Sequence, residues 1–377
     1  MTAPLLAPRD RCSGCGACAA GCPRDAITLV SDREGFRYPQ IGDSCVSCGH
    51  CSHICPALKQ RETRPASAVY AAWHTDDTLR ARSGAGGAFT AMAQYVLESG
   101  GVVFGAVLDQ NMTVRHTAVH HPGDLAALRG PKPVQSDLGD TYRQIRRAVD
   151  GGQTVLFSGT PCQVDGLYRY LGEHPEHLLT CDLVCSGVAS PGVWNKLVDT
   201  MSYIKRRSVV NVHFADKLPQ TTERRFRVWF DGGGTYDAPL SKSQFGRGYL
   251  RRLLLRPACH TCPYANGNRV GDITLGTFHG LTGELAGEEA KGVSLLLVNS
   301  VKGAHLFDAL PLHRERRSFV EAAAHNTALC TPAAAGEKRS EFFEALDSAA
   351  SVRAALQQYL SAESPLGKWK EKLWKKR

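Results

Sequence analysis

The sequence predicts an α/β protein in two parts, a small α+β head rich in cysteine and a larger α/β body with a mixed sheet. Two cysteine runs occupy residues 12–56. After residue 68, short apolar segments typical of strands alternate with segments whose apolar residues recur at helical spacing, which favours an α/β body. A chain of 377 residues that is 43% hydrophobic and 21% charged is long and apolar enough for about two or three domains.

The head, residues 1–60, contains two copies of one cysteine pattern, CSGCGACAAGCP at 12–23 and CVSCGHCSHICP at 45–56. Each copy has the spacing C-x2-C-x2-C-x3-C-P, which is typical of proteins that bind 4Fe-4S clusters. Three cysteines of one run can hold three irons of a cluster, and the last cysteine of the other run holds the fourth. The predicted ligands are therefore Cys12, Cys15, Cys18 and Cys55 for one cluster, and Cys45, Cys48, Cys51 and Cys22 for the other.

Zinc sites and disulfides are the alternatives for this stretch. A structural zinc ion takes four ligands and does not require this spacing, and an apolar chain of this length needs no disulfides. The N-terminus has neither a basic region nor an apolar core typical of a signal peptide, and no run approaches about 18 apolar residues. We therefore expect a cytoplasmic protein with reduced thiolates. The stretch closely resembles bacterial two-cluster ferredoxins.

The body is expected at 68–330, after the polar linker RETRPAS at 61–67, and a helical tail is expected at 331–377. Strands are predicted where apolar and β-branched residues cluster, and helices where apolar residues recur at helical spacing. The predicted strands are 69–74, 101–108, 112–119, 154–158, 178–184, 209–215, 272–276 and 293–300. The predicted helices are 87–98, 141–150, 161–171 and 191–206.

One predicted junction between a strand and a helix carries a cysteine. Gly159 follows the strand 154–158, Thr160 is a natural N-cap residue, and Pro161 suits the first helical position. Cys162 then lies in the first turn, where the helix N-terminus stabilises a thiolate. Cys162 is therefore expected to be either a ligand or a reactive thiol.

A third 4Fe-4S cluster is expected in the body. Cys185 directly follows the strand 178–184, and CHTCP at 259–263 supplies two further cysteines. The carboxyl ends of parallel strands meet at one edge of a sheet, so these cysteines can approach Cys162. The predicted ligands are Cys162, Cys185, Cys259 and Cys262. The alternative is buried, inert cysteine, which is the main expectation for Cys181 and Cys330.

Several segments give the chain a resemblance to the coenzyme F420 hydrogenase/dehydrogenase beta-subunit family. They are SGAGGAFTA at 83–91, GGVVFGAV at 100–107, VQSDLGDTY at 134–142, FSGTPCQVDGL at 157–167, DLVCSGV at 182–188, RPACHTCP at 256–263 and RVGDITLGTFHG at 269–280. The resemblance implies that the body binds FAD and one 4Fe-4S cluster, the latter through the four body cysteines. It implies FAD contacts at Ser83, Gly84, Gly86, Gly87, Thr90, Gln135, Ser136, Gly159 and Thr160.

The glycines of this loop can let the backbone approach a flat ring or a pyrophosphate. By itself, GAGGAF lacks the third glycine of a dinucleotide fingerprint, and the start of a glycine-rich helix fits it equally well. The chain departs from the family pattern at Thr277, where an acid is usual, and at Pro133 and His279, where aromatic residues are usual. These departures affect the predicted identity of the hydride partner more than the predicted fold. His279 is either a proton donor near the flavin or a structural histidine.

Iron-sulfur clusters exchange one electron at a time, a hydride partner exchanges two, and a flavin can do both. The resemblance therefore implies an iron-sulfur flavoprotein oxidoreductase that connects ferredoxin, or another redox protein, to a two-electron partner. That partner would be coenzyme F420, a nicotinamide or a reducible organic substrate. The alternatives are an electron-relay subunit of a larger complex with no substrate of its own, and a scaffold that has lost its flavin site. No residue pattern indicates the direction of electron flow or the oligomeric state.

The net charge of +9 is concentrated at the C-terminal end, where LGKWKEKLWKKR at 366–377 has six basic residues and one Glu. Leu366, Trp369 and Leu373 share one helical face, which predicts either peripheral contact with an anionic membrane or an ordinary terminal helix packed on the body. Elsewhere basic residues occur in short groups and there is no nucleic-acid-binding motif, so no nucleic-acid partner is expected.

Overall fold

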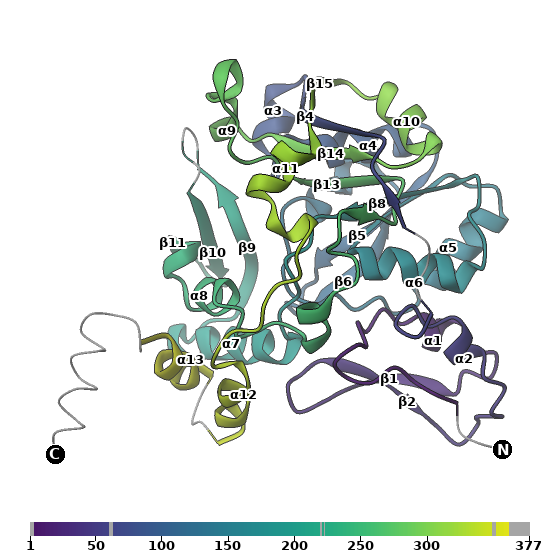
Figure 1. Cartoon of the computed structure of the whole chain (residues 1–377). Coiled ribbons are helices and arrows are strands. Elements are labelled where there is room, and N and C mark those ends of the chain that lie inside the picture. The colour runs from purple at the N-terminus through teal and green to yellow at the C-terminus, as the bar shows by residue number, and fades with distance from the viewer. Residues whose placement is uncertain (1–3, 60–62, 219–220, 222, 349–351, 362–377) are drawn as a thin grey trace.

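A mixed eight-stranded sheet forms the centre of the body (Figure 1). The computed structural model describes residues 4–59, 63–218, 221, 223–348 and 352–361. The strand order is β15-β4-β14-β13-β8-β7-β5-β6. The strands are β4 (Ala68–His74), β5 (Val102–Leu108), β6 (Val114–Val119), β7 (Val155–Gly159), β8 (Leu178–Leu183), β13 (Ile273–Thr277), β14 (Ser294–Val298) and β15 (Leu312–Arg317).

Parallel pairing joins β5, β7, β8 and β13, whereas the strands towards both edges pair antiparallel. The residues of β7 and β14 are buried throughout, as expected for central strands covered on both faces. The α/β class and the mixed sheet predicted from the sequence are therefore confirmed.

Helices cover both faces of this sheet. On one face α4 (Ala88–Glu98) packs its buried side chains, including Met92 and Val96, against alternate strand residues such as Leu156. On the other face α5 (Thr141–Asp150) and α6 (Pro161–Leu171) pack against the intervening residues, including Phe157. These helices begin and end within one residue of their predicted limits, and α7 (Pro191–Lys205) does so too.

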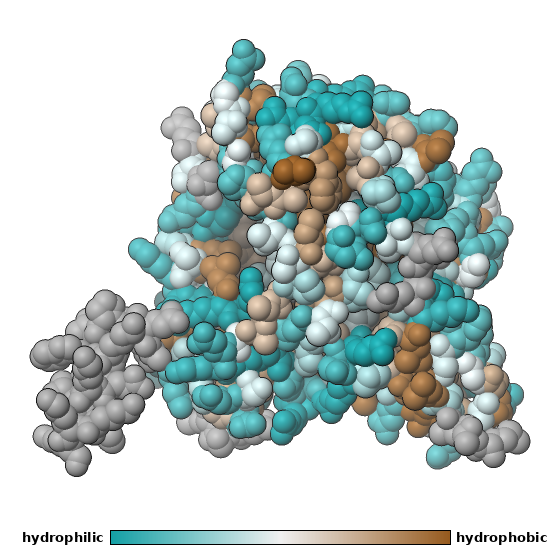
Figure 2. All heavy atoms as spheres, in the orientation of Figure 1, coloured by the Kyte–Doolittle hydropathy of each residue, from teal (hydrophilic) through white to brown (hydrophobic). Residues whose placement is uncertain are grey.

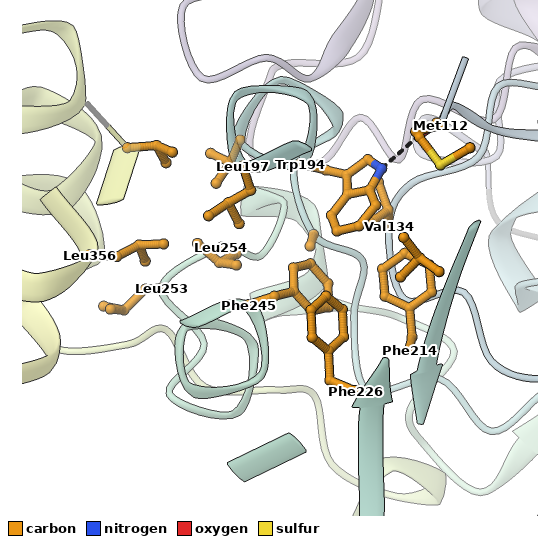
Figure 3. Packing of buried hydrophobic residues seen from close by; sticks show 14 of the residues in the cluster. Met112, Val134, Trp194, Leu197, Phe214, Phe226, Phe245, Leu253, Leu254 and Leu356 are labelled. Carbon is orange, nitrogen blue, oxygen red and sulfur yellow. Dashed lines mark hydrogen bonds between the residues drawn. The ribbon is translucent and has the colours of Figure 1, made fainter. Parts of the chain in front are cut away.

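A second, three-stranded antiparallel sheet lies beside the body sheet (Figure 1) and is formed by β9 (Val209–Lys217), β10 (Arg224–Phe230) and β11 (Thr235–Pro239). It packs with α7 and α8 (Gln244–Leu250) around aromatic side chains, and Figure 3 shows Phe214, Phe226 and Phe245 gathered beside Trp194. The indole nitrogen of Trp194 donates a hydrogen bond to the Met112 carbonyl oxygen at 2.6 Å. The strand predicted at 209–215 therefore belongs to a separate sheet, and the sequence did not predict β10 and β11.

The two cysteine runs of the head fold alike. The short helices α1 (Ala17–Ala20) and α2 (His50–His53) each follow a glycine in the left-handed region, Gly16 with φ of 76° and Gly49 with φ of 74°. Between the runs, β1 (Ile27–Ser31) and β2 (Arg37–Ile41) form an antiparallel hairpin. Figure 2 shows hydrophobic surface over the region of β1 and β2, and the large exposed hydrophobic residues of the head are Leu5, Val30 and Val46.

The remaining elements connect these layers. They are β3 (Arg64–Pro65), β12 (Asn268–Arg269), α3 (Asp77–Ala81), α9 (Glu288–Lys291), α10 (Val301–Asp308), α11 (Phe319–His325), α12 (Arg339–Ser348), α13 (Val352–Ser361) and the 3-10 turns Pro122–Leu128, Leu240–Lys242, Pro257–Thr261, Gly283–Leu285 and Thr327–Leu329. Helix α13 packs on α7 and α8. Of the predicted tail, the amphipathic segment 366–377 lies outside the described residues. Among the helices that are described, none combines the length and apolarity needed to cross a membrane.

Candidate redox site

The two predicted ligand sets of the head each combine residues of both runs. The inner group is Cys12, Cys15, Cys18 and Cys55, which all line one small cavity, and the outer group is Cys22, Cys45, Cys48 and Cys51. In the inner group, burial raises the pKa of Cys18 to about 12, and the nearby thiolates of Cys12 and Cys55 add to this rise. In the outer group, burial raises the pKa of Cys51, with a smaller contribution from Cys22. Cys18 and Cys55, or Cys51 and Cys22, belong to different runs. The fold therefore brings cysteines of the two runs close together, and the crossed ligand sets stay a prediction.

The body cysteines form a third group. Burial raises the pKa of Cys162 to about 12, and the neighbouring Cys262 and Cys259 thiolates contribute. Burial also raises the pKa of Cys185, and there Cys259 and Cys162 contribute. The first turn of α6, the segment after β8, and the 3-10 turn Pro257–Thr261 with the residue that follows it thus place these four sulfurs within electrostatic reach of one another.

A single metal ion and an iron-sulfur cube need different arrangements of their thiolate ligands. Zinc holds its thiolates at about 2.3 Å, which forces the sulfurs into a tight tetrahedron. In the part of the chain that the structure describes, no three His, Cys, Asp or Glu side chains are placed to hold one metal ion. The chemistry of the donor set, four thiols that line one cavity, fits an iron-sulfur cube.

A buried ion pair positions the loop that carries Cys185. The Arg269 guanidinium donates to the Asp182 carboxylate at 2.7 Å and to the Leu183 carbonyl oxygen at 2.9 Å. The other carboxylate oxygen of Asp182 accepts the Gly271 N–H at 2.9 Å. Removing either charge would leave the other buried without its partner, so the pair fixes the end of β8 and the direction in which Cys185 leaves it.

The inner head group lies next to the body group. The thiolate of Cys162 contributes to the raised pKa of Cys15, for which burial is the main cause. At Gly166, on the second turn of α6, an added Cβ would lie 3.0 Å from the Cys15 sulfur and 2.9 Å from the Tyr142 hydroxyl. The missing side chain therefore allows the head to approach α6 closely.

A cavity of about 390 Å³ opens beside the body cysteines, and all four of them line it. This volume is in the range of ordinary cofactor sites. Eight of the nine expected FAD contacts also line it: Ser83, Gly84, Gly87, Thr90, Gln135, Ser136, Gly159 and Thr160. Gly86 does not. Its N–H donates to the Ser294 hydroxyl at 3.0 Å, and an added Cβ would lie 2.4 Å from the Ala72 carbonyl oxygen. Gly86 therefore serves the packing of the loop on β4 and β14.

Two cations that the sequence reasoning missed line the same cavity. Burial lowers the pKa of Lys132 to about 8, and its amine donates to the carbonyl oxygens of Arg129 at 2.9 Å and Gly130 at 3.3 Å. Burial lowers the pKa of Arg129 as well, and Arg82 adds to the shift. The Arg129 guanidinium donates to the Thr90 hydroxyl at 3.3 Å. Both basic residues belong to the segment RGPKPVQS at 129–136, which also contains Gln135. Their closeness to an expected FAD contact was the signal that could have predicted them as cavity residues.

Three further residues have positions that bear on their predicted roles. His279 is half-exposed, lies 3.3 Å from the Glu289 carboxylate and does not line the cavity, whereas Thr277 does. Cys181 is buried in β8, where burial raises its pKa, as expected of an inert cysteine. Cys330 is exposed, so the expectation that it is buried was wrong. It directly follows the 3-10 turn Thr327–Leu329, in which Leu329 is the buried residue.

Comparison with protein-family models covers most of the chain. Two models describe the beta subunit of coenzyme F420 hydrogenase/dehydrogenase; the one for its N-terminal part matches residues 69–141, and the one for its C-terminal part matches residues 152–316. The chain belongs to this family. A 4Fe-4S dicluster model matches residues 11–58, which confirms the head as a 4Fe-4S domain. The family and the dicluster head together assign the chain an iron-sulfur redox role.

Individual relatives are distant. Over 284 residues, 71% of this chain and 75% of the relative, the chain is 22% identical to one of the subunits of the F(420)H(2) dehydrogenase of Methanosarcina mazei. It is 28% identical to the coenzyme F420-dependent sulfite reductase of Methanocaldococcus jannaschii over 180 residues, which are 44% of this chain and 26% of that protein. A chain of the F420-reducing [NiFe] hydrogenase complex from Methanosarcina barkeri aligns with a TM-score of 0.49 and 16% identity, covering 76% of this chain and 93% of that chain.

Proposed function

We propose that this protein is an FAD- and iron-sulfur-dependent oxidoreductase that connects a one-electron carrier such as ferredoxin to a two-electron partner, coenzyme F420. The observation that carries the proposal is the continuous succession of the outer head group, the inner head group, the body group and the cavity. Cys18 lies within electrostatic reach of Cys51, and Cys15 of Cys162. This succession supports a route for electrons between the head and the cavity.

The cysteines suit three 4Fe-4S clusters, one per group, with the ligand sets stated above. Backbone amides already donate to their sulfurs, from Ala26 to Cys22 at 3.3 Å, from Ser47 to Cys45 at 3.4 Å and from Gly187 to Cys185 at 3.4 Å. Such bonds favour the thiolate over the thiol and stabilise the negative charge of a cluster. Cys48 is exposed, and it places the outer group where a redox protein can approach.

The cavity suits a flavin. A bound flavin exchanges electrons singly with clusters and in pairs with a hydride partner. Gly84 and Gly87 leave room for close approach of the ligand, and the N-terminus of the eleven-residue helix α4 favours an anion. Lys132 and Arg129 would neutralise a pyrophosphate. Leu128 and Leu275 supply apolar wall that excludes water.

The named relatives support F420 as the two-electron partner, since both the dehydrogenase and the sulfite reductase carry F420 in their descriptions. The first of these relatives is also one subunit of an enzyme. This favours, as the second candidate, a relay subunit that passes electrons within a complex and has no substrate of its own.

Anaerobic purification followed by metal and flavin analysis tests the proposal. We expect about twelve irons, from three clusters, and one FAD per chain. Reduced F420 and reduced ferredoxin are then added separately while the flavin absorbance is followed. Bleaching by reduced F420 supports the enzyme. Bleaching by ferredoxin alone supports the relay subunit, and a protein without flavin contradicts both.

A further inference from the structure

Arg256 is a fully buried cation at the junction of head and body. It is 0% exposed and lies three residues before Cys259. Its Nε donates to the Cys12 carbonyl oxygen at 2.7 Å, and its Nη2 lies 3.8 Å from the Cys12 sulfur. The same Nη2 donates to the Arg37 carbonyl oxygen at 3.0 Å. A residue of the body thus contacts the first cysteine of the inner head group through both its backbone and its sulfur.

The guanidinium has no carboxylate partner among the described residues. Besides the contacts to Cys12 and Arg37, Nη1 donates to the Gln135 amide oxygen at 2.8 Å, and the Tyr38 and Phe36 rings lie 4.1 and 5.4 Å from its centre. An isolated buried charge costs several kcal/mol unless an opposite charge is close. Among these contacts, the group that becomes negative when it ligates a cluster is the Cys12 sulfur.

We propose that Arg256 raises the reduction potential of the cluster held by Cys12, Cys15, Cys18 and Cys55. The inference rests on the ligand set of the proposed function. Reduction adds one electron to a cluster that is already negative, and a guanidinium keeps its charge in proteins, so it stabilises the added electron with no need for a proton. Charged and hydrogen-bonding groups beside cluster sulfurs are known determinants of cluster potential.

The outer group differs in this respect. Within the described residues, Cys22 and Cys45 of this group accept hydrogen bonds from neutral backbone amides, those of Ala26 and Ser47, and a charge-assisted hydrogen bond is roughly twice as strong as a neutral one. Arg256 therefore shifts the electron equilibrium between the two clusters towards the inner one, which lies next to the body group.

Gln135 connects this arrangement to the cavity. Its amide oxygen accepts from Arg256, its amide nitrogen donates to the Ser13 carbonyl oxygen at 3.1 Å, and the residue lines the cavity. It holds the guanidinium without adding charge. Gln135→Glu would therefore place a carboxylate against Arg256 without replacing any cysteine, and it would lose the hydrogen bond to the Ser13 carbonyl oxygen.

The test is an anaerobic redox titration of the full-length protein with dithionite, followed by electron paramagnetic resonance, for the wild type and for Arg256→Met, Arg256→Lys and Gln135→Glu. We expect Arg256→Met and Gln135→Glu to lower the midpoint potential of one cluster by 59 mV or more, a tenfold change in a one-electron equilibrium. Arg256→Lys, which keeps the charge, should change it less. Arg339→Gln is the control for the cluster of Cys12, because Arg339 is a second buried arginine at this junction but pairs with Glu34. Among the described residues it makes no hydrogen bond to a sulfur, and its charge acts on Cys259 of the body group.

If Arg256→Met loses iron or does not fold, the midpoint potential measured in Gln135→Glu tests the proposal. Unchanged potentials in Gln135→Glu at full iron content would overturn the proposal. An equal shift in Arg339→Gln would also overturn it, because loosening of the junction would then explain the effect. A wild-type protein without 4Fe-4S signals would instead contradict the proposed function.

Discussion

Thr160 shows how one residue serves both the local helix and the site. Its side chain forms a capping box with Gln163, whose amide oxygen accepts the Thr160 N–H at 2.9 Å. The Gln163 amide nitrogen donates to the Ser136 hydroxyl, also at 2.9 Å. The Thr160 hydroxyl lies 3.1 Å from the Cys162 sulfur. The cap that starts α6 therefore also positions Cys162, a predicted cluster ligand, and one wall of the cavity.

Removal of one body cysteine should remove one cluster. In Cys185→Ser we expect the iron content to fall from about twelve to about eight per chain, because the head groups retain all their ligands. Cys181→Ala is the matched control, since Cys181 is a buried cysteine four residues away in β8. It should retain all its iron. Iron analysis of both anaerobic proteins checks this, and an unchanged iron content in Cys185→Ser would contradict the third ligand set.

At the residue level, the sequence allowed the cysteines to be predicted as ligands, but not the residues that contact them in the fold. The spacing of cysteines in the two runs is set by the shape of a cluster and can be read locally. Arg256 contacts Cys12 across 244 positions of sequence, and no local pattern reports such a contact. Gly86, an expected FAD contact, does not line the cavity for a related reason. In a sequence, a glycine needed for packing on a strand looks the same as a glycine needed to admit a ligand.

The contact between α6 and the head depends on Gly166. Helix propensity alone predicts that Gly166→Ala stabilises α6 by about 1 kcal/mol. We expect the opposite, a loss of about 1 to 2 kcal/mol in unfolding free energy, because the new Cβ would displace Cys15 or Tyr142. Urea unfolding measures the change. Gly123→Ala is the control, since nothing lies within 4 Å of a Cβ at Gly123; a stabilised Gly166→Ala variant would refute the close approach.

The β9–β10 hairpin is expected to support flavin binding through Lys217, at the end of β9. Its amine donates to the carbonyl oxygens of Arg80 at 2.8 Å, Ala85 at 2.9 Å and Lys291 at 3.2 Å. Ala85 belongs to the glycine-rich loop that lines the cavity. In Lys217→Met the loop loses this anchor, so we predict that the flavin Kd rises about tenfold, or about 1.4 kcal/mol.

Flavin titration of the deflavinated protein measures this effect. Lys302→Met provides the comparison, since the Lys302 amine donates to the carbonyl oxygens of Pro175 and Leu178, at 2.9 and 2.7 Å, neither of which lines the cavity. Equal losses of affinity in both variants would show that Lys217 has no particular role in the site.

Among the elements, helices with clear apolar periodicity and caps were predicted closely, and the strands of the body sheet were mostly found. The second sheet was not foreseen. Alternating strands and helices indicate a layered sheet, but they do not say which strands share it. In β10 the buried residues alternate with Arg225 and Arg227, which pair with Asp237 on β11, so the segment looks polar when read without its partner.

At the scale of the whole molecule, the head is seated on the body by matched surfaces. Phe36 of the head is 0% exposed and belongs to the same apolar cluster as Trp194 and Phe343 of the body. The backbones of Gly35 and Gly192 approach so closely that a Cβ on Gly35 would lie 2.5 Å from Gly192 Cα. Such packing favours a fixed head over a swinging one.

The ion pair between Glu34 and Arg339 closes this junction at 2.5 Å, with side chains 14% and 9% exposed. In Glu34→Gln we expect the free energy of unfolding of the head to fall by about 2 kcal/mol, because a charged hydrogen bond is lost and a buried arginine loses its counter-ion. The urea concentration at which cluster absorbance disappears should fall. Glu284→Gln, at an exposed position, should not change it. An unaltered midpoint in Glu34→Gln would indicate that the apolar contacts alone hold the head.

The unequal exposure of the head cysteines has a consequence for handling the protein in air. Cys12 and Cys15 are buried at the junction, whereas Cys48 faces solvent. Molecular oxygen would therefore attack the solvent-facing end first, while the inner thiolates stay covered by the body. Brief aeration should bleach the brown colour in stages, because the cluster of the outer head group would be lost before those of the inner head group and the body group.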